Sequence, residues 1–190
     1  MAGTQGGILS ALLNGIVSAF TGDRRRTGHA SPARPTAPSG RTGTSAPAAG
    51  QHGATATTEI EPPRGSGLRI TYAPERDGDP DAGEVVWTWV PYEENDGRGK
   101  DRPVLVIGRQ SADRVYAVRL TSKAHDRDRD FLPIGTGEWD GQGRPSWVDI
   151  EQLYSVHRKG MRREASALDL KRFAIVAQAL SARYGWSVGE

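Results

Sequence analysis

The chain has 190 residues, no cysteine, and 25 basic against 23 acidic side chains, which gives a net charge of +2. The lack of cysteine excludes disulfides and thiolate metal sites, and the near balance of charge gives no argument for nucleic-acid binding from composition alone. The histidines lie far apart, without a ligand spacing such as HxxxH, at His29, His52, His125 and His157. We therefore expect no metal and no other cofactor.

Residues 1–26 predict a short amphipathic helix followed by a basic cluster. The stretch ILSALLNGIVSAF, residues 8–20, repeats its apolar residues at helical spacing, and three arginines follow at 24–26. No segment reaches the roughly 18 apolar residues of a membrane span, and a signal peptide would carry its charges first. We expect a cytoplasmic protein whose helix is marginal and either docks on its own chain or stays unconstrained, with contact to a membrane or a partner as the less favoured alternative.

Residues 27–81 predict a disordered linker. From 27 to 58, 27 of the 32 residues are Gly, Pro, Ser, Thr or Ala. A segment of this composition has too little apolar surface to offset the entropy lost on ordering. Residues 59–81 continue polar and rich in turn signals, so we expect them to belong to the same linker.

Residues 82–190 predict the folded domain, which is mainly β with a C-terminal helix (α+β). Short β-branched or apolar runs separated by turn residues favour a small barrel, with strands at 84–90, 102–109, 114–122, 131–134, 146–150 and 153–157. The helix is expected to begin at Ser166, paired with Asp169 in a capping box, and to end at Gly185.

The stretch GKDRPVLVIGR, residues 99–109, places a cation at the mouth of a buried strand. Pro103 favours an extended backbone at Arg102, and the apolar run after it anchors that backbone. Antiparallel pairing with residues 114–121 brings position 102 opposite about 121, so Arg102 and Thr121 are expected to be neighbours. A guanidinium and a hydroxyl in this arrangement suit a phosphodiester.

Two charged loops have alternative interpretations. The loop PYEENDGRGKD, residues 91–101, is long for a hairpin connection and is either a binding loop or a solvated charged loop. The loop HDRDRD, residues 125–130, lacks the Gly and Glu that a calcium loop needs at its sixth and twelfth positions. We expect this second loop to be self-neutralised, with contact of Arg127 and Arg129 to a nucleic-acid backbone as the less favoured alternative.

Taken in order, the segments GEVVWTWVPYEENDGRGKDRPVLVIGR, VRLTSK and SWVDIEQLYSV, with the final helix, resemble the PemK/MazF family of bacterial toxins over about residues 82–184. The resemblance implies an SH3-like barrel with a C-terminal helix, usually homodimeric, and a metal-independent endoribonuclease that cuts single-stranded RNA at short sequences. It also implies a cognate antitoxin that blocks the RNA groove, and binding of operator DNA by the toxin–antitoxin complex.

The resemblance places the family's catalytic arginine at Arg102 and its threonine or serine at Thr121, with Ser122 as the close alternative. Some relatives carry a glutamate shortly before the arginine, where this chain has the sequence GRGK at 97–100. The general base therefore stays open among Glu93, Glu94 and His157. Contacts to RNA are expected from Tyr92, Arg98, Lys100 and Lys123. The alternative function is a non-catalytic module of the same fold that binds nucleic acid or protein.

Overall fold

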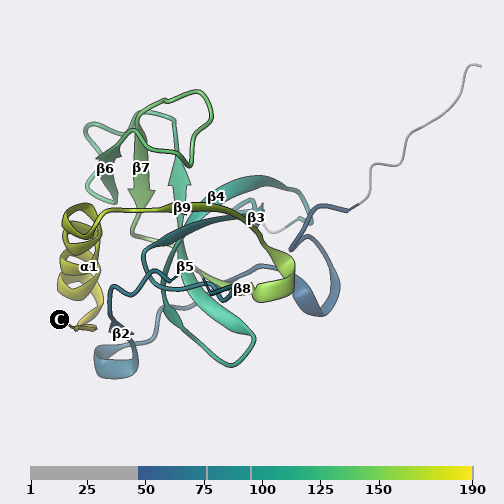
Figure 1. Ribbon diagram of the computed structural model, residues 1–190, viewed down its shortest axis with the longest axis horizontal. Coiled ribbons are helices and arrows are strands. Elements are labelled where there is room, and N and C mark those ends of the chain that lie inside the picture. Colours follow the sequence, from purple (N-terminus) through teal and green to yellow (C-terminus); the bar gives the residue numbers. More distant parts are fainter. Residues whose placement is uncertain (1–46, 76, 95, 190) are drawn as a thin grey trace, which may run out of the picture. The chain divides into compact units, whose positions relative to one another are not determined.

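The computed structural model describes residues 47–75, 77–94 and 96–189. These residues form a mostly β structure with one α-helix near the C-terminus (Figure 1). This confirms the coarse fold class. The helix expected at 1–26 and the first part of the expected linker, 27–46, lie outside the described residues.

The strands of the described residues fall into one large and one small sheet. They are β1 Thr58–Ile60, β2 Arg69–Ile70, β3 Glu84–Pro91, β4 Gly99–Arg109, β5 Arg114–Thr121, β6 Phe131–Gly135, β7 Ser146–Asp149, β8 Leu153–His157, β9 Arg162–Ala167 and β10 Ser187–Val188. The helices are α1 Leu170–Tyr184 and three short 3₁₀ turns, η1 Gly53–Thr55, η2 Gly65–Gly67 and η3 Arg158–Gly160.

The large sheet runs in the order β1-β8-β5-β4-β3-β9, and β7 pairs with both β5 and β6. Its neighbouring strands are antiparallel. The β6–β7 pair extends from one end of the sheet (Figure 1), and β2 and β10 form the small parallel sheet. Strands therefore occur at each of the six ranges expected from the sequence, whereas β1, β2, β9 and β10 were not foreseen.

The central strand β4 is buried on both faces of the sheet. Leu105 and Ile107 belong to a cluster that includes the inner face of α1, and Val104 and Val106 belong to a second cluster with residues of β3, β5 and β8. All four are 0% exposed. This double burial explains why the sequence here is a continuous apolar run and not an alternating one.

The helix α1 begins later than the capping box predicted. Its N-cap is Asp169, whose carboxylate accepts a hydrogen bond from the backbone N–H of Arg172 at 3.0 Å, while Ser166 lies in β9. Gly185 ends the helix as expected, in the left-handed conformation with φ +76°. No helix among the described residues is long and apolar enough to cross a membrane.

The expectation of a disordered linker is wrong for the described residues between 47 and 81. β1 pairs with β8, and Leu68 and Ile70 are buried in the main core at 4% and 0% exposure. Tyr72 packs against the same core and donates a hydrogen bond to the carbonyl of Leu168 at 2.8 Å. Composition failed here because a few apolar residues and backbone pairing to an existing sheet suffice to order a polar segment.

Polar contacts attach the beginning of this segment to the sheet. The Thr88 hydroxyl is buried, donates to the carbonyl of Gly160 at 2.7 Å and shares a 2.6 Å hydrogen bond with Thr57. Gly50 lies against the same atoms with φ +80°, where a Cβ would come 2.3 Å from the Thr88 oxygen. The Arg114 guanidinium donates to the carbonyls of Ala54 and Ala56 at 2.8 and 3.2 Å.

Substituting Thr88→Val is expected to lower the free energy of unfolding by about 1–3 kcal/mol, because it leaves the Gly160 carbonyl and the Thr57 hydroxyl buried without this partner. The matched control is Thr58→Val, since Thr58 is exposed in β1 and the change should stay within about 0.5 kcal/mol. Urea unfolding followed by circular dichroism measures both. Equal stability of the two variants would contradict the role assigned to this network.

Candidate active site

A cavity of about 680 Å³ lies where β3, β4 and β5 meet the loops that follow β5 and β6. Both residues of the predicted phosphate grip, Arg102 and Thr121, line it. We call this cavity the Arg102 cleft. The register between β4 and β5 ends with the pair Val104 and Arg119, and two further residues in the same register would bring position 102 opposite position 121, as the hairpin argument expected.

Arg102 is held by the strand on its other side. Its backbone pairs with Thr88 of β3, and Pro103 pairs with Trp87. The guanidinium is half-buried, its Nε has no hydrogen-bond partner, and it makes no ion pair with any described residue. Burial lowers the pKa of Arg102 below its ordinary value, and the positive charge of Arg119 lowers it further. A cation kept in this state favours an anionic ligand.

Thr121 is the last residue of β5. It pairs with Trp147 of β7, and its hydroxyl accepts a hydrogen bond from the backbone N–H of Lys123 at 3.2 Å. This contact holds the oxygen at the wall of the cleft and leaves its proton available for donation. The hydroxyl can therefore donate to an oxygen of a bound phosphate.

The Arg102 cleft also contains an ion pair that sequence reasoning missed. Arg119, 12% exposed, contacts the carboxylate of Asp149, 2% exposed, at 2.6 Å and that of Glu93 at 3.8 Å. Asp149 is further held by the backbone N–H of Glu151 at 2.9 Å. Glu59, which comes from the segment expected to be a linker, belongs to the same group: burial, and then the charge of Glu93, raise its pKa.

The expected loop residues divide into two groups. Those that line the Arg102 cleft are Glu93, Lys100, Ser122 and Lys123. Those that do not are Tyr92, Glu94, Arg98 and His157. The guanidinium of Arg98 is exposed and pairs with Asp96 at 2.6 Å.

His157 is the base candidate that the fold places furthest from Thr121 along the sheet. It pairs with Arg114, at the opposite end of β5 from Thr121. Its Nδ1 accepts a hydrogen bond from the backbone N–H of Lys159 at 3.0 Å. The geometry therefore gives His157 a structural place in the turn after β8 and none in the cleft.

The loop after β5 adds residues to the cleft that the sequence analysis did not select. His125 and Asp128 of this loop line its wall with Phe131, the first residue of β6, although the loop was expected to be a self-neutralised surface segment. Their position in the sequence could have identified them, because the loop leaves β5 directly after Thr121. Histidine and phenylalanine are also side chains that stack on unpaired bases.

Unsatisfied polar atoms concentrate at this cleft. Among the described side chains, six buried nitrogen or oxygen atoms have no hydrogen-bond partner, and four of them belong to residues that line it: Trp87 Nε1, Asp101 Oδ1, Arg102 Nε and Arg119 Nε. Trp87 and Trp89 share one face of β3 and are both half-buried, so neither is a core residue. Buried polar atoms without hydrogen-bond partners are typical of functional sites.

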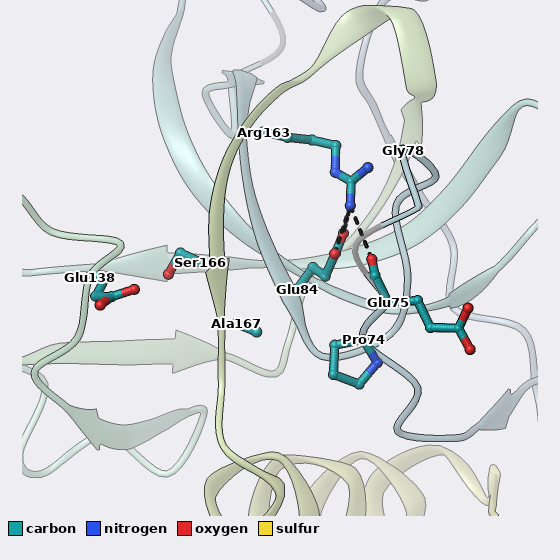
Figure 2. A pocket seen from close by; sticks show the side chains of 8 residues that line it. All are labelled: Pro74, Glu75, Gly78, Glu84, Glu138, Arg163, Ser166 and Ala167. Carbon is teal, nitrogen blue, oxygen red and sulfur yellow. Dashed lines mark hydrogen bonds and ion pairs between the residues drawn. The ribbon is translucent and has the colours of Figure 1, made fainter.

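A second cavity, of about 530 Å³, lies beside β9 and has a different electrostatic character (Figure 2). Its guanidinium, Arg163, points at the carboxylate of Glu84 and contacts both carboxylate oxygens, at 2.7 and 2.8 Å. Glu75 and Glu138 add two more carboxylates to the lining. Because its cation is already neutralised, this cavity does not suit a phosphate as the Arg102 cleft does.

The comparisons with known proteins assign the class of protein to which this fold and cleft belong. Residues 81–183 match the family of PemK-like, MazF-like toxins of type II toxin–antitoxin systems, and the chain belongs to this family. No curated protein sequence matches the chain.

Solved structures that match the chain include two from Deinococcus radiodurans. One is a MazE–MazF complex, at 21% identity and a TM-score of 0.43, and the other is MazF, at 22% identity and a TM-score of 0.43. Each match covers 56% of this chain and 96% of the chain in the solved structure.

Proposed function

We propose that this chain is an endoribonuclease toxin that cleaves single-stranded RNA, with messenger RNA as the substrate. The observation that carries the proposal is the half-buried guanidinium of Arg102, which has no carboxylate partner among the described residues and lines one cleft with the Thr121 hydroxyl. Family membership supports the same class of activity.

The reaction uses the 2′-hydroxyl of the RNA itself as nucleophile. Its oxygen attacks the adjacent phosphorus, the bond to the 5′-oxygen breaks, and the products are a 2′,3′-cyclic phosphate and a 5′-hydroxyl. The chemistry needs no metal to generate the nucleophile, so the enzyme has to stabilise the charge of the crowded phosphorane and move two protons.

Arg102 supplies the charge stabilisation and Thr121 binds a non-bridging oxygen. A guanidinium is a poor base because its ordinary pKa exceeds about 12, so Arg102 is not the group that accepts the proton of the 2′-hydroxyl. Lys100 and Lys123 line the same cleft and contact neighbouring phosphates, and Ser122 is the alternative hydroxyl.

The partners follow from the class of protein. A type II toxin is controlled by a cognate antitoxin, which we expect to cover the Arg102 cleft and to form with the toxin a complex that binds operator DNA. We further propose that the chain acts as a homodimer in the cytoplasm, where its messenger RNA substrate is found.

A second candidate function is a non-catalytic module that binds nucleic acid or protein. The observation in its favour is the mixed charge of the cleft, where Arg119 and Arg144 are neutralised by Asp149 and Asp140 at 2.6 and 2.8 Å. Such a surface attracts an RNA backbone less strongly than a uniformly basic groove.

A cleavage assay separates the two functions. Purified full-length protein is incubated with single-stranded RNA in EDTA, beside Arg102→Ala and Thr121→Ala. We expect cleavage by the wild type to survive EDTA, and Thr121→Ala to cut about 10²–10³ times more slowly because one phosphate-binding donor is lost. Arg102→Ala should be inactive.

The matched control for Arg102→Ala is Arg64→Ala, whose side chain is 92% exposed and lies outside the cleft. It should cleave as the wild type does. RNA that stays intact with every variant, but binds to the wild type, would replace the proposed function by the non-catalytic one. Equal cleavage by wild type and Arg102→Ala would show that another site does the chemistry.

A further inference from the structure

His125 occupies a position in the Arg102 cleft that no other histidine of the described residues shares. It lies four residues after Thr121, so the two Cα atoms are at most about 14 Å apart. Both side chains line the same cavity. The path of the chain therefore places the His125 ring near the predicted phosphate grip of Arg102 and Thr121.

The imidazole is held by an aromatic ring and a carboxylate. It stacks on Phe131 with ring centroids 3.6 Å apart and an angle of 10° between the planes. Its Nδ1 lies 3.6 Å from Oδ2 of Asp128, and the backbone N–H of Asp128 donates back to the His125 carbonyl at 3.0 Å. The other oxygen of Asp128 accepts from the backbone N–H of Asp130 at 3.0 Å, which orients the carboxylate.

Asp128 lies on the Nδ1 side of the ring. The 3.6 Å separation is longer than a hydrogen bond, and contacts of this kind commonly shorten when substrate binds. A carboxylate that reaches Nδ1 favours a proton on that nitrogen, which leaves the lone pair on Nε2 as the acceptor.

Other acceptors in the cleft are less well placed to take the proton. Each of three carboxylates is paired with an arginine: Asp101 with Arg162 at 2.7 Å, Asp140 with Arg144 at 2.8 Å and Asp149 with Arg119 at 2.6 Å. Glu93 and Glu151 contact Arg119 and Arg183 at the longer distances of 3.8 and 3.9 Å, and their side chains are 70% and 61% exposed. Asp128, which also lines the cleft, lies against His125 itself.

We propose that His125 is the general base of the RNA cleavage, a role that rests on the proposed function. Nε2 accepts the proton of the 2′-hydroxyl as its oxygen bonds to phosphorus. The bond from phosphorus to the 5′-oxygen breaks, this oxygen takes a proton from water, and the imidazolium returns its proton to solvent. Asp128 and Phe131 are positioning residues for the ring.

The test compares His125→Phe and His125→Ala with the wild type under saturating RNA. The phenylalanine keeps the stack on Phe131 but accepts no proton, so stacking and proton transfer are separated. We expect both variants to cleave about 10²–10⁴ times more slowly. Imidazole in the buffer should restore part of the activity of His125→Ala and none of Arg102→Ala.

Binding is measured separately, with an RNA that carries 2′-O-methyl groups and cannot react. His125→Phe should bind it as the wild type does. The matched control is His52→Ala, because His52 is exposed and outside the cleft, and it should cleave normally.

The outcomes for His125 and for the proposed function are distinguishable. Wild-type cleavage that is lost in Arg102→Ala but kept in His125→Phe overturns the role of His125 alone. A loss of cleavage in His125→Phe that is matched by an equal loss of RNA binding also overturns it, in favour of base stacking. A wild-type protein that cleaves no RNA overturns both.

Discussion

Replacing Arg102 by methionine is expected to abolish RNA cleavage and, at the same time, to make the protein more stable. The loss of activity follows from removing the cation that stabilises the phosphorane, and we expect a rate at least about 10²–10³ times lower. The gain in stability follows from the environment of the guanidinium. It is half-buried, its Nε has no hydrogen-bond partner, and no carboxylate of the described residues pairs with it.

Methionine fills a similar volume without a charge or an unsatisfied donor. Because leaving a buried donor unpaired costs about 1–3 kcal/mol, and Arg102 is only partly buried, we expect a gain near the lower end, about 1 kcal/mol. This corresponds to a rise in Tm of about 2–4 °C for a domain of this size. Differential scanning calorimetry of the full-length chain measures the change.

The same substitution at Arg64 serves as the control. Its side chain is 92% exposed, so Arg64→Met should change neither cleavage nor Tm measurably. Arg102→Lys tests geometry, since it keeps the charge but loses the planar fork, and we expect it to remain well below the wild-type rate. A fall in Tm with Arg102→Met would mean that the guanidinium stabilises the fold, contrary to the interpretation as a binding group.

That Arg102 and Thr121 line the same cleft could be predicted because it depends on local information. The apolar run that anchors β4 and the alternating pattern of β5 lie within one hairpin, and their pairing fixes which ends come together. His125 follows Thr121 by only four residues, and its place in the cleft required only the recognition that the loop after β5 returns to the site.

The parts that were missed depend on contacts between distant segments. β9 has the sequence RREASA, without an apolar or alternating pattern, and it is ordered by pairing with β3 and by the ion pair between Arg163 and Glu84, 79 residues away. β1 is likewise ordered by a distant segment, because it pairs with the free edge of β8. Single-sequence patterns report how one segment buries its own side chains, and they do not report which strand edge another segment will cover.

The buried pair of Arg119 and Asp149 belongs to the same category, since 30 residues separate its members. It also carries the largest stability effect that we expect in the molecule. Asp149→Asn keeps the shape of the side chain and the oxygen that accepts from the Glu151 N–H, but removes the negative charge. Among the described residues, Arg119, 12% exposed, then retains an ion pair with Glu93 alone, at 3.8 Å. Breaking a buried pair in this way should cost about 3–5 kcal/mol.

The double variant Arg119→Met/Asp149→Asn distinguishes the pair from the two residues taken singly. With both charges removed, no uncompensated cation remains, so the double variant should be more stable than Asp149→Asn alone. Urea unfolding of the wild type, both single variants and the double variant completes a double-mutant cycle. We expect an interaction energy of at least about 1 kcal/mol, and additive effects would contradict the assignment.

The exposed pair of Arg64 and Glu61 provides the matched reference cycle. Its atoms are 3.7 Å apart, but the two side chains are 92% and 82% exposed. Solvent screens a pair of this kind, so Glu61→Gln should change the free energy of unfolding by less than about 1 kcal/mol. The two pairs are expected to differ because of burial. Arg119 is desolvated, so hydration cannot replace the favourable interaction that is lost when the charge of Asp149 is removed.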